Sequence, residues 1–142
     1  MPECRRILGI AILVCCLAEQ AVAGSVQSFK GGVQYYGDIE SGDFAKVRTA
    51  IQRSAKKTLY LNSAGGLVDE ALKIGAFVRD VGVETRLGRQ ATCASACVLV
   101  FAGGVIRSAD ETASIIVHMG SGIFNEEALA RFESIHGDFG AV

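Results

Sequence analysis

A single serine stands at the centre of the stretch Thr92-Cys93-Ala94-Ser95-Ala96-Cys97-Val98-Leu99-Val100, flanked by alanines and cysteines. The apolar residues that continue to Gly103-Gly104 predict a buried helix over 95–102. A nucleophilic serine on a sharp turn into a helix needs small neighbours, and Ala94 and Ala96 meet that need. The free N–H groups at the start of the helix would stabilise an oxyanion that develops beside the serine. A serine in this position is also a common helix cap, so the choice between nucleophile and cap depends on the rest of the sequence.

Strands alternate with helices on both sides of this stretch. Residues 24–32 are expected to form a loose polar lead-in, residues 88–92 a connecting loop, and Ser41 or Asp43 a helix cap. The alternation predicts an α/β domain with a largely parallel sheet flanked by helices. Strands are expected at 33–36, 58–61, 83–87 and 114–117, and helices at 44–54, 68–80, 95–102 and 125–135.

Residues 1–23 have the three parts of a secretory signal peptide. Arg5-Arg6 form a positive start, residues 7–18 are apolar, and Ala21-Val22-Ala23 is a typical cleavage site. The apolar run is too short to span the ~30 Å hydrocarbon core of a membrane. We therefore expect cleavage after Ala23, no stable membrane anchor, and an exported domain of residues 24–142 in the periplasm or outside the cell.

Composition and cysteine content narrow the function further. The 142 residues carry a formal net charge of −1 and no basic stripe, so a nucleic-acid partner is not expected. Cleavage would leave Cys93 and Cys97 as the cysteines of the exported chain, where a disulfide is favoured. A metal site formed by these cysteines and His118 lacks a second ligand pair with a familiar zinc spacing. We expect neither a metal nor another cofactor.

Three segments fall at the carboxyl ends of predicted parallel strands, where sites in such sheets collect. They are Leu61-Asn62-Ser63-Ala64-Gly65-Gly66-Leu67-Val68, then Cys93-Ala94-Ser95-Ala96-Cys97, then Val117-His118-Met119. In this order the segments resemble the ClpP-type serine peptidases, and are most similar to the exported, periplasmic ClpP-like branch of the ClpP/crotonase superfamily. The resemblance runs from about Val33 to Phe132, and it implies a spiral of repeated β-β-α and βαβ units.

The resemblance also implies a role for each residue that matches. Ser95 matches the nucleophile and His118 the general base, while the N–H groups of Ala96 and of Gly66 (or Gly65) match the oxyanion hole. The segment from Gly65 to Val68 would pair with an extended peptide substrate by strand addition. Ala64 stands where the family commonly has proline.

The end of the sequence departs from the family. The acidic third member of the triad would lie beyond the last expected helix, but the sequence ends at Val142. We therefore expect a domain that is incomplete at its C-terminal end and that relies on a Ser–His dyad. The missing elements would leave sheet surface open, so a homo-oligomer is expected.

Three functions follow from these observations. The first is an exported serine peptidase that cleaves peptide or protein substrates. The second is a catalytically inactive ClpP-like module that binds extended peptides, which the absence of the acid favours. The third is acyl-CoA chemistry of the crotonase kind; both the signal peptide and Ser95 count against it.

Overall fold

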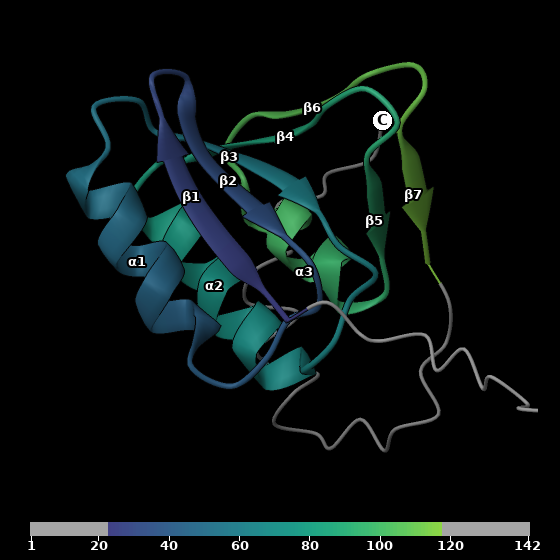
Figure 1. Ribbon diagram of the computed structural model, residues 1–142, viewed down its shortest axis with the longest axis horizontal. Helices are drawn as coiled ribbons and strands as arrows, with labels where there is room; N and C mark the ends of the chain where they lie inside the picture. Colours follow the sequence, from purple (N-terminus) through teal and green to yellow (C-terminus); the bar gives the residue numbers. More distant parts are fainter. Residues whose placement is uncertain (1–22, 118–142) are drawn as a thin grey trace, which may run out of the picture.

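A computed structural model describes residues 23–117 of the chain (Figure 1). Residues 1–22 and 118–142 lie outside the described part. His118 and the helix expected at 125–135 therefore lie outside it. Of the expected signal peptide, only the last residue, Ala23, is described.

The described chain is a mixed α/β structure with a mostly parallel sheet. The main sheet has the strand order β1-β2-β3-β4-β6, in which only the β1–β2 pair is antiparallel. A second sheet consists of the parallel pair β5–β7. The strands are β1 (Ser25–Phe29), β2 (Gly32–Tyr36), β3 (Thr58–Asn62), β4 (Glu84–Leu87), β5 (Thr92–Ala94), β6 (Arg107–Ala109) and β7 (Ser114–Ile116).

Three helices, α1 (Asp43–Arg53), α2 (Val68–Asp80) and α3 (Ala96–Gly103), lie together on one side of the main sheet (Figure 1). Side chains in a strand alternate between the two faces. In β2, β3 and β4 one set of alternate residues is buried, whereas Gln34 and Arg86 on the other face are exposed. The core therefore lies between this sheet and its helices. Its strand residues are Val33, Tyr35, Leu59, Leu61, Thr85 and Leu87.

Three local expectations were wrong. Residues 25–29 form β1 rather than a loose lead-in, because this polar edge strand is held by backbone pairing with β2 and not by an apolar pattern. Residues 92–94 form β5, which is too short for periodicity to reveal. Gly42 is the N-cap of α1 with a φ of 91°, so neither Ser41 nor Asp43 caps that helix.

Helices α2 and α3 approach one another at two glycines. A Cβ added to Gly103 would lie 2.3 Å from the carbonyl oxygen of Gly75, and one added to Gly75 would lie 2.8 Å from that of Leu99. Backbone atoms cannot yield as a flexible side chain would. The close crossing therefore requires the absence of a side chain at both positions.

We expect Gly103→Ala to lower the free energy of unfolding by about 1–3 kcal/mol, because the new methyl group overpacks the crossing. The gain in helix propensity, about 1 kcal/mol, acts in the opposite direction but does not remove the clash. Urea unfolding followed by circular dichroism measures the change. Gly88→Ala is the control, because a Cβ at Gly88 meets nothing within 4 Å. Equal stability of the two variants would contradict the crossing.

Two carboxylates organise the start of α1. Asp43 is fully buried, and its Oδ2 lies 2.6 Å from the Tyr35 hydroxyl and accepts the N–H of Glu40 at 2.8 Å. Its Oδ1 pairs with Lys46 at 2.8 Å. Glu70 of α2 accepts the N–H of Phe44 at 3.0 Å, which satisfies a donor that α1 itself cannot pair.

Both carboxyl pKa values are lowered by these contacts. Burial alone would raise the pKa of Asp43, but the hydrogen bonds from Lys46, Tyr35 and Glu40 outweigh it. At Glu70 the hydrogen bond from Phe44, helped by Lys73, outweighs burial and lowers the pKa. The unfolded chain therefore takes up protons at higher pH than the folded chain does.

It follows that both carboxylates contribute stability in full above their ordinary pKa values of 3.8 and 4.5, and that this contribution is lost as the pH falls below them. We expect the urea midpoint to drop between pH 6 and pH 3 (roughly the carboxyl range). An Asp43→Asn, Glu70→Gln double variant should show a shallower drop. The same pH dependence in both proteins would rule out this assignment.

Candidate active site

Ser95 occupies a sharp turn between β5 and α3. Its backbone has φ 53° and ψ −125°, and Gln90 is the one other non-glycine residue of the described chain with a positive φ. Such a conformation costs about 1–3 kcal/mol and persists only where the surroundings impose it. A strand, a strained serine and a helix in this order form the arrangement that presents a nucleophilic hydroxyl in serine hydrolases.

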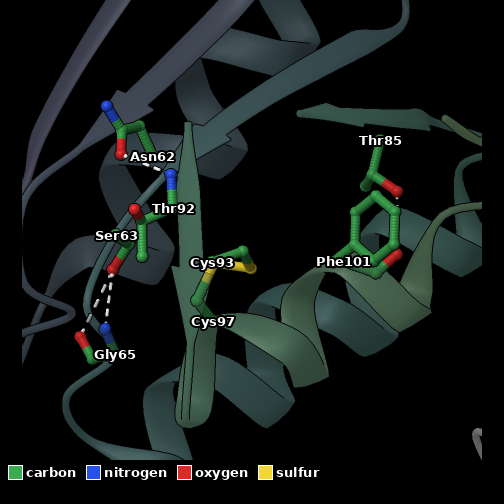
Figure 2. Close-up of a disulfide and its surroundings, with 8 residues drawn as sticks. All are labelled: Asn62, Ser63, Gly65, Thr85, Thr92, Cys93, Cys97 and Phe101. Carbon is green, nitrogen blue, oxygen red and sulfur yellow. Dashed lines mark hydrogen bonds between the residues drawn. A yellow bond between two sulfur atoms is a disulfide. The ribbon is translucent and has the colours of Figure 1, made fainter. Parts of the chain in front are cut away.

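Contacts on both sides of Ser95 hold the turn. Its N–H donates to the carbonyl oxygen of Ile116 in β7 at 2.9 Å, and its own carbonyl accepts the N–H of Val98 at 3.0 Å. The structure joins Cys93 and Cys97, both fully buried, in a disulfide across the turn (Figure 2). The cross-link ties the last residues of β5 to the first turn of α3.

The glycine pair lies directly against this turn. A Cβ added to Gly65 would lie 2.8 Å from the Cβ of Ser95 and 3.2 Å from the nitrogen of Ala96. Gly65 has φ 114° and Gly66 has φ 135°, a region that other residues rarely adopt. The close approach and the backbone conformation thus both require glycine at Gly65.

Side chains of the segment before the glycines connect it to β5, as Figure 2 shows. Asn62 accepts the N–H of Thr92 through Oδ1 at 3.0 Å, and the Ser63 hydroxyl accepts the N–H of Gly65 at 3.1 Å. The backbone of Ser63 also pairs with β5. Its N–H donates to the carbonyl oxygen of Thr92, and its carbonyl oxygen accepts the N–H of Ala94. The glycine pair and the serine turn are therefore parts of one hydrogen-bonded unit.

Two backbone N–H groups in this unit have no acceptor among the described residues. Ala96 is the first residue of α3, so its N–H has no partner within the helix. Ile39 bonds to the carbonyl of Gly65 and to the N–H of Leu67, which leaves the N–H of Gly66 between them unused. Within residues 23–117 neither N–H group has an acceptor. Such a pair of donors beside a serine is what stabilisation of an oxyanion requires.

The remaining candidate residues are placed less completely. Val68 is the first residue of α2 and is 37% exposed, so the extended segment after the glycines ends at Leu67. His118 lies outside the described residues, and the description ends one residue before it, at Val117. Ile116, which comes two residues before His118 in the sequence, is hydrogen-bonded to Ser95 and therefore lies beside the serine turn. Sequence patterns gave no signal for Ile39, because its role is a backbone contact between distant segments.

Two kinds of feature are absent from the described residues. No group of three or more histidine, cysteine, aspartate or glutamate side chains between residues 23 and 117 could hold a metal ion. No helix in the same range has the length and apolar character needed to cross a membrane.

Comparison with known proteins gives little further guidance. No protein-family model and no curated protein matches the chain. Among solved structures the chain is similar to a "putative enoyl-CoA hydratase from Streptomyces coelicolor A3(2)", a weak structural neighbour with 13% identity and a TM-score of 0.39. The match covers 75% of this chain and 52% of that protein, so the chain spans about half its length. A likeness this weak carries no argument about activity.

The disulfide gives a direct test of the serine turn. We expect a Cys93→Ala, Cys97→Ala variant to lose about 2 kcal/mol of unfolding free energy, the chain-entropy value for so short a loop. Urea unfolding with and without dithiothreitol measures it. The reductant should destabilise the parent protein and leave the variant unchanged. A parent protein insensitive to reductant and equal to the variant would contradict the cross-link.

Proposed function

We propose that the protein is an exported serine hydrolase that cleaves peptide bonds, with Ser95 as nucleophile and His118 as general base. The fold we propose for it is the ClpP/crotonase-like spiral. The order of the described elements agrees with that fold, and the sequence resemblance of the three motifs favours it. Export is proposed from the leader-like residues 1–23, and a homo-oligomer remains the proposed assembly.

One observation carries the proposal above all others: the strained backbone of Ser95 beside two N–H groups that have no acceptor within residues 23–117. An ordinary helix cap has β-region dihedrals and a side chain that bonds to the helix. Ser95 has a positive φ and makes no side-chain cap hydrogen bond. Strain without a structural benefit is typical of catalytic positions.

The proposed reaction proceeds in two steps. Ser95 Oγ attacks the carbonyl carbon of the substrate while His118 takes the hydroxyl proton, and the oxyanion accepts the N–H groups of Ala96 and Gly66. The C–N bond then breaks, and His118 returns the proton to the leaving amine. Water, deprotonated by His118, hydrolyses the acyl-enzyme and restores the Ser95 hydroxyl.

The test is covalent labelling by a fluorophosphonate probe of the protein expressed from its full sequence. We expect labelling of the parent protein, no labelling of Ser95→Ala, and labelling of His118→Ala that is slower by about 10²- to 10⁴-fold, the usual contribution of a general base. Mass spectrometry locates the modified residue.

Matched controls exist for both substitutions. Ser108 is an exposed serine on β6, and His136 is the second of the two histidines in the sequence. Ser108→Ala and His136→Ala should label as the parent protein does. A folded parent protein that does not label would refute the hydrolase proposal and favour the inactive peptide-binding module.

A further inference from the structure

We infer that Tyr35 and Asp43 form a buried positioning pair that holds the N–H of Gly66 in the oxyanion hole. The inference rests on the proposed function and adds Tyr35 of β2 and Asp43, the first residue of α1, which lie on either side of the β2–α1 loop. Neither touches Ser95. Their action passes through the backbone of Ile39.

Ile39 is the residue that fixes the glycine pair from outside the site. Its N–H donates to the carbonyl of Gly65 at 2.6 Å, and its carbonyl accepts the N–H of Leu67 at 2.8 Å. A Cβ on Gly66 would lie 2.2 Å from the Ile39 carbonyl oxygen, so the two backbones are in direct contact. These bonds hold the peptide units on both sides of Gly66, and they therefore determine where its N–H points.

Tyr35 and Asp43 hold Ile39 from both of its neighbours. The Tyr35 hydroxyl lies 2.8 Å from the carbonyl oxygen of Asp38, and Asp43 Oδ2 accepts the N–H of Glu40 at 2.8 Å. The hydroxyl and the carboxylate also lie 2.6 Å apart. The residue before Ile39 and the residue after it are thus tied to one buried pair.

The pair is suited to this role because both side chains are buried and a charged carboxylate accepts the hydrogen bonds. Tyr35 is 2% exposed and Asp43 is 0% exposed, so neither side chain exchanges its partners with water. Burial, and then the hydrogen bond to Asp43, raise the pKa of Tyr35, which keeps its hydroxyl neutral and able to donate. Lys46 balances the charge of the carboxylate.

The first measurement is the rate of fluorophosphonate labelling at Ser95 in three variants. Tyr35→Phe removes the hydroxyl and Asp43→Ala removes the acceptor, so both should slow labelling by about 10- to 100-fold, less than the 10²–10³ lost with an oxyanion donor itself. Asp43→Asn keeps an oxygen at the same place and should restore labelling to within about three-fold of the parent rate. The Tyr35→Phe, Asp43→Ala double variant should be no slower than the slower single variant, because the two side chains contact each other and both act through the backbone of Ile39.

A stability control separates positioning from simple destabilisation. Gly103→Ala weakens the fold at the α2–α3 crossing, at the opposite end of α3 from Ser95, and meets Gly75 rather than Ile39, so it should label at the parent rate. Hydrogen exchange of the Ile39 and Leu67 amides provides a readout that is independent of activity. Both amides should exchange faster in Tyr35→Phe and should be unchanged in Asp43→Asn.

The outcomes distinguish failure of the inference from failure of the proposed function. A parent protein that labels at Ser95, together with a Tyr35→Phe variant that labels equally fast, would overturn the positioning pair and leave the hydrolase intact. If Gly103→Ala slowed labelling as much as Tyr35→Phe does, the slowing would be explained by lost stability, and the positioning pair would be overturned as well. A folded parent protein that does not label would overturn both.

Discussion

The turn at Ser95 is the constraint on which the rest of the site depends. A serine with φ 53° is unfavourable in isolation, so the surrounding structure has to supply the free energy that maintains it. Here the hydrogen bond that Ser95 donates to β7, the disulfide across the turn and the close packing of Gly65 act on the same few atoms. Each contact comes from a different part of the chain. The conformation of one residue therefore reports on the assembly of several elements.

Much of the architecture could be predicted from the sequence because its signals are local. The apolar stripes of α1 and α2 and the β-rich runs of β3 and β4 have clear periods, and the parallel order of their strands follows from their alternation with helices. The serine turn was also visible in the sequence, since Ala94 and Ala96 are small where a tight turn needs small residues. The glycine pair stood out for the same reason.

The rest was hidden because it depends on backbone contacts between distant segments. β1 carries no apolar alternation, and β5 pairs with a strand twenty residues later, so neither has a local signature. The bond between Ile39 and the glycine pair involves no side chain at all. The buried position of Asp43 was equally invisible, since an aspartate at the start of a helix is normally a solvated residue. Hydropathy reports which side chains are buried, not which peptide units are paired.

The dependence of Ser95 on β7 has a consequence for synthesis. Strands β1 to β4 and helices α1 and α2 are complete by Leu87, and most of the buried core belongs to them. The acceptor for the Ser95 N–H is Ile116, which leaves the ribosome almost thirty residues after β4 ends. A chain that emerges N-terminal end first, from the ribosome or from an export channel, would thus bury most of its core before it can hold its serine in place. Any hydrolytic activity would then arise late in folding, after the segment that contains β7 has been released.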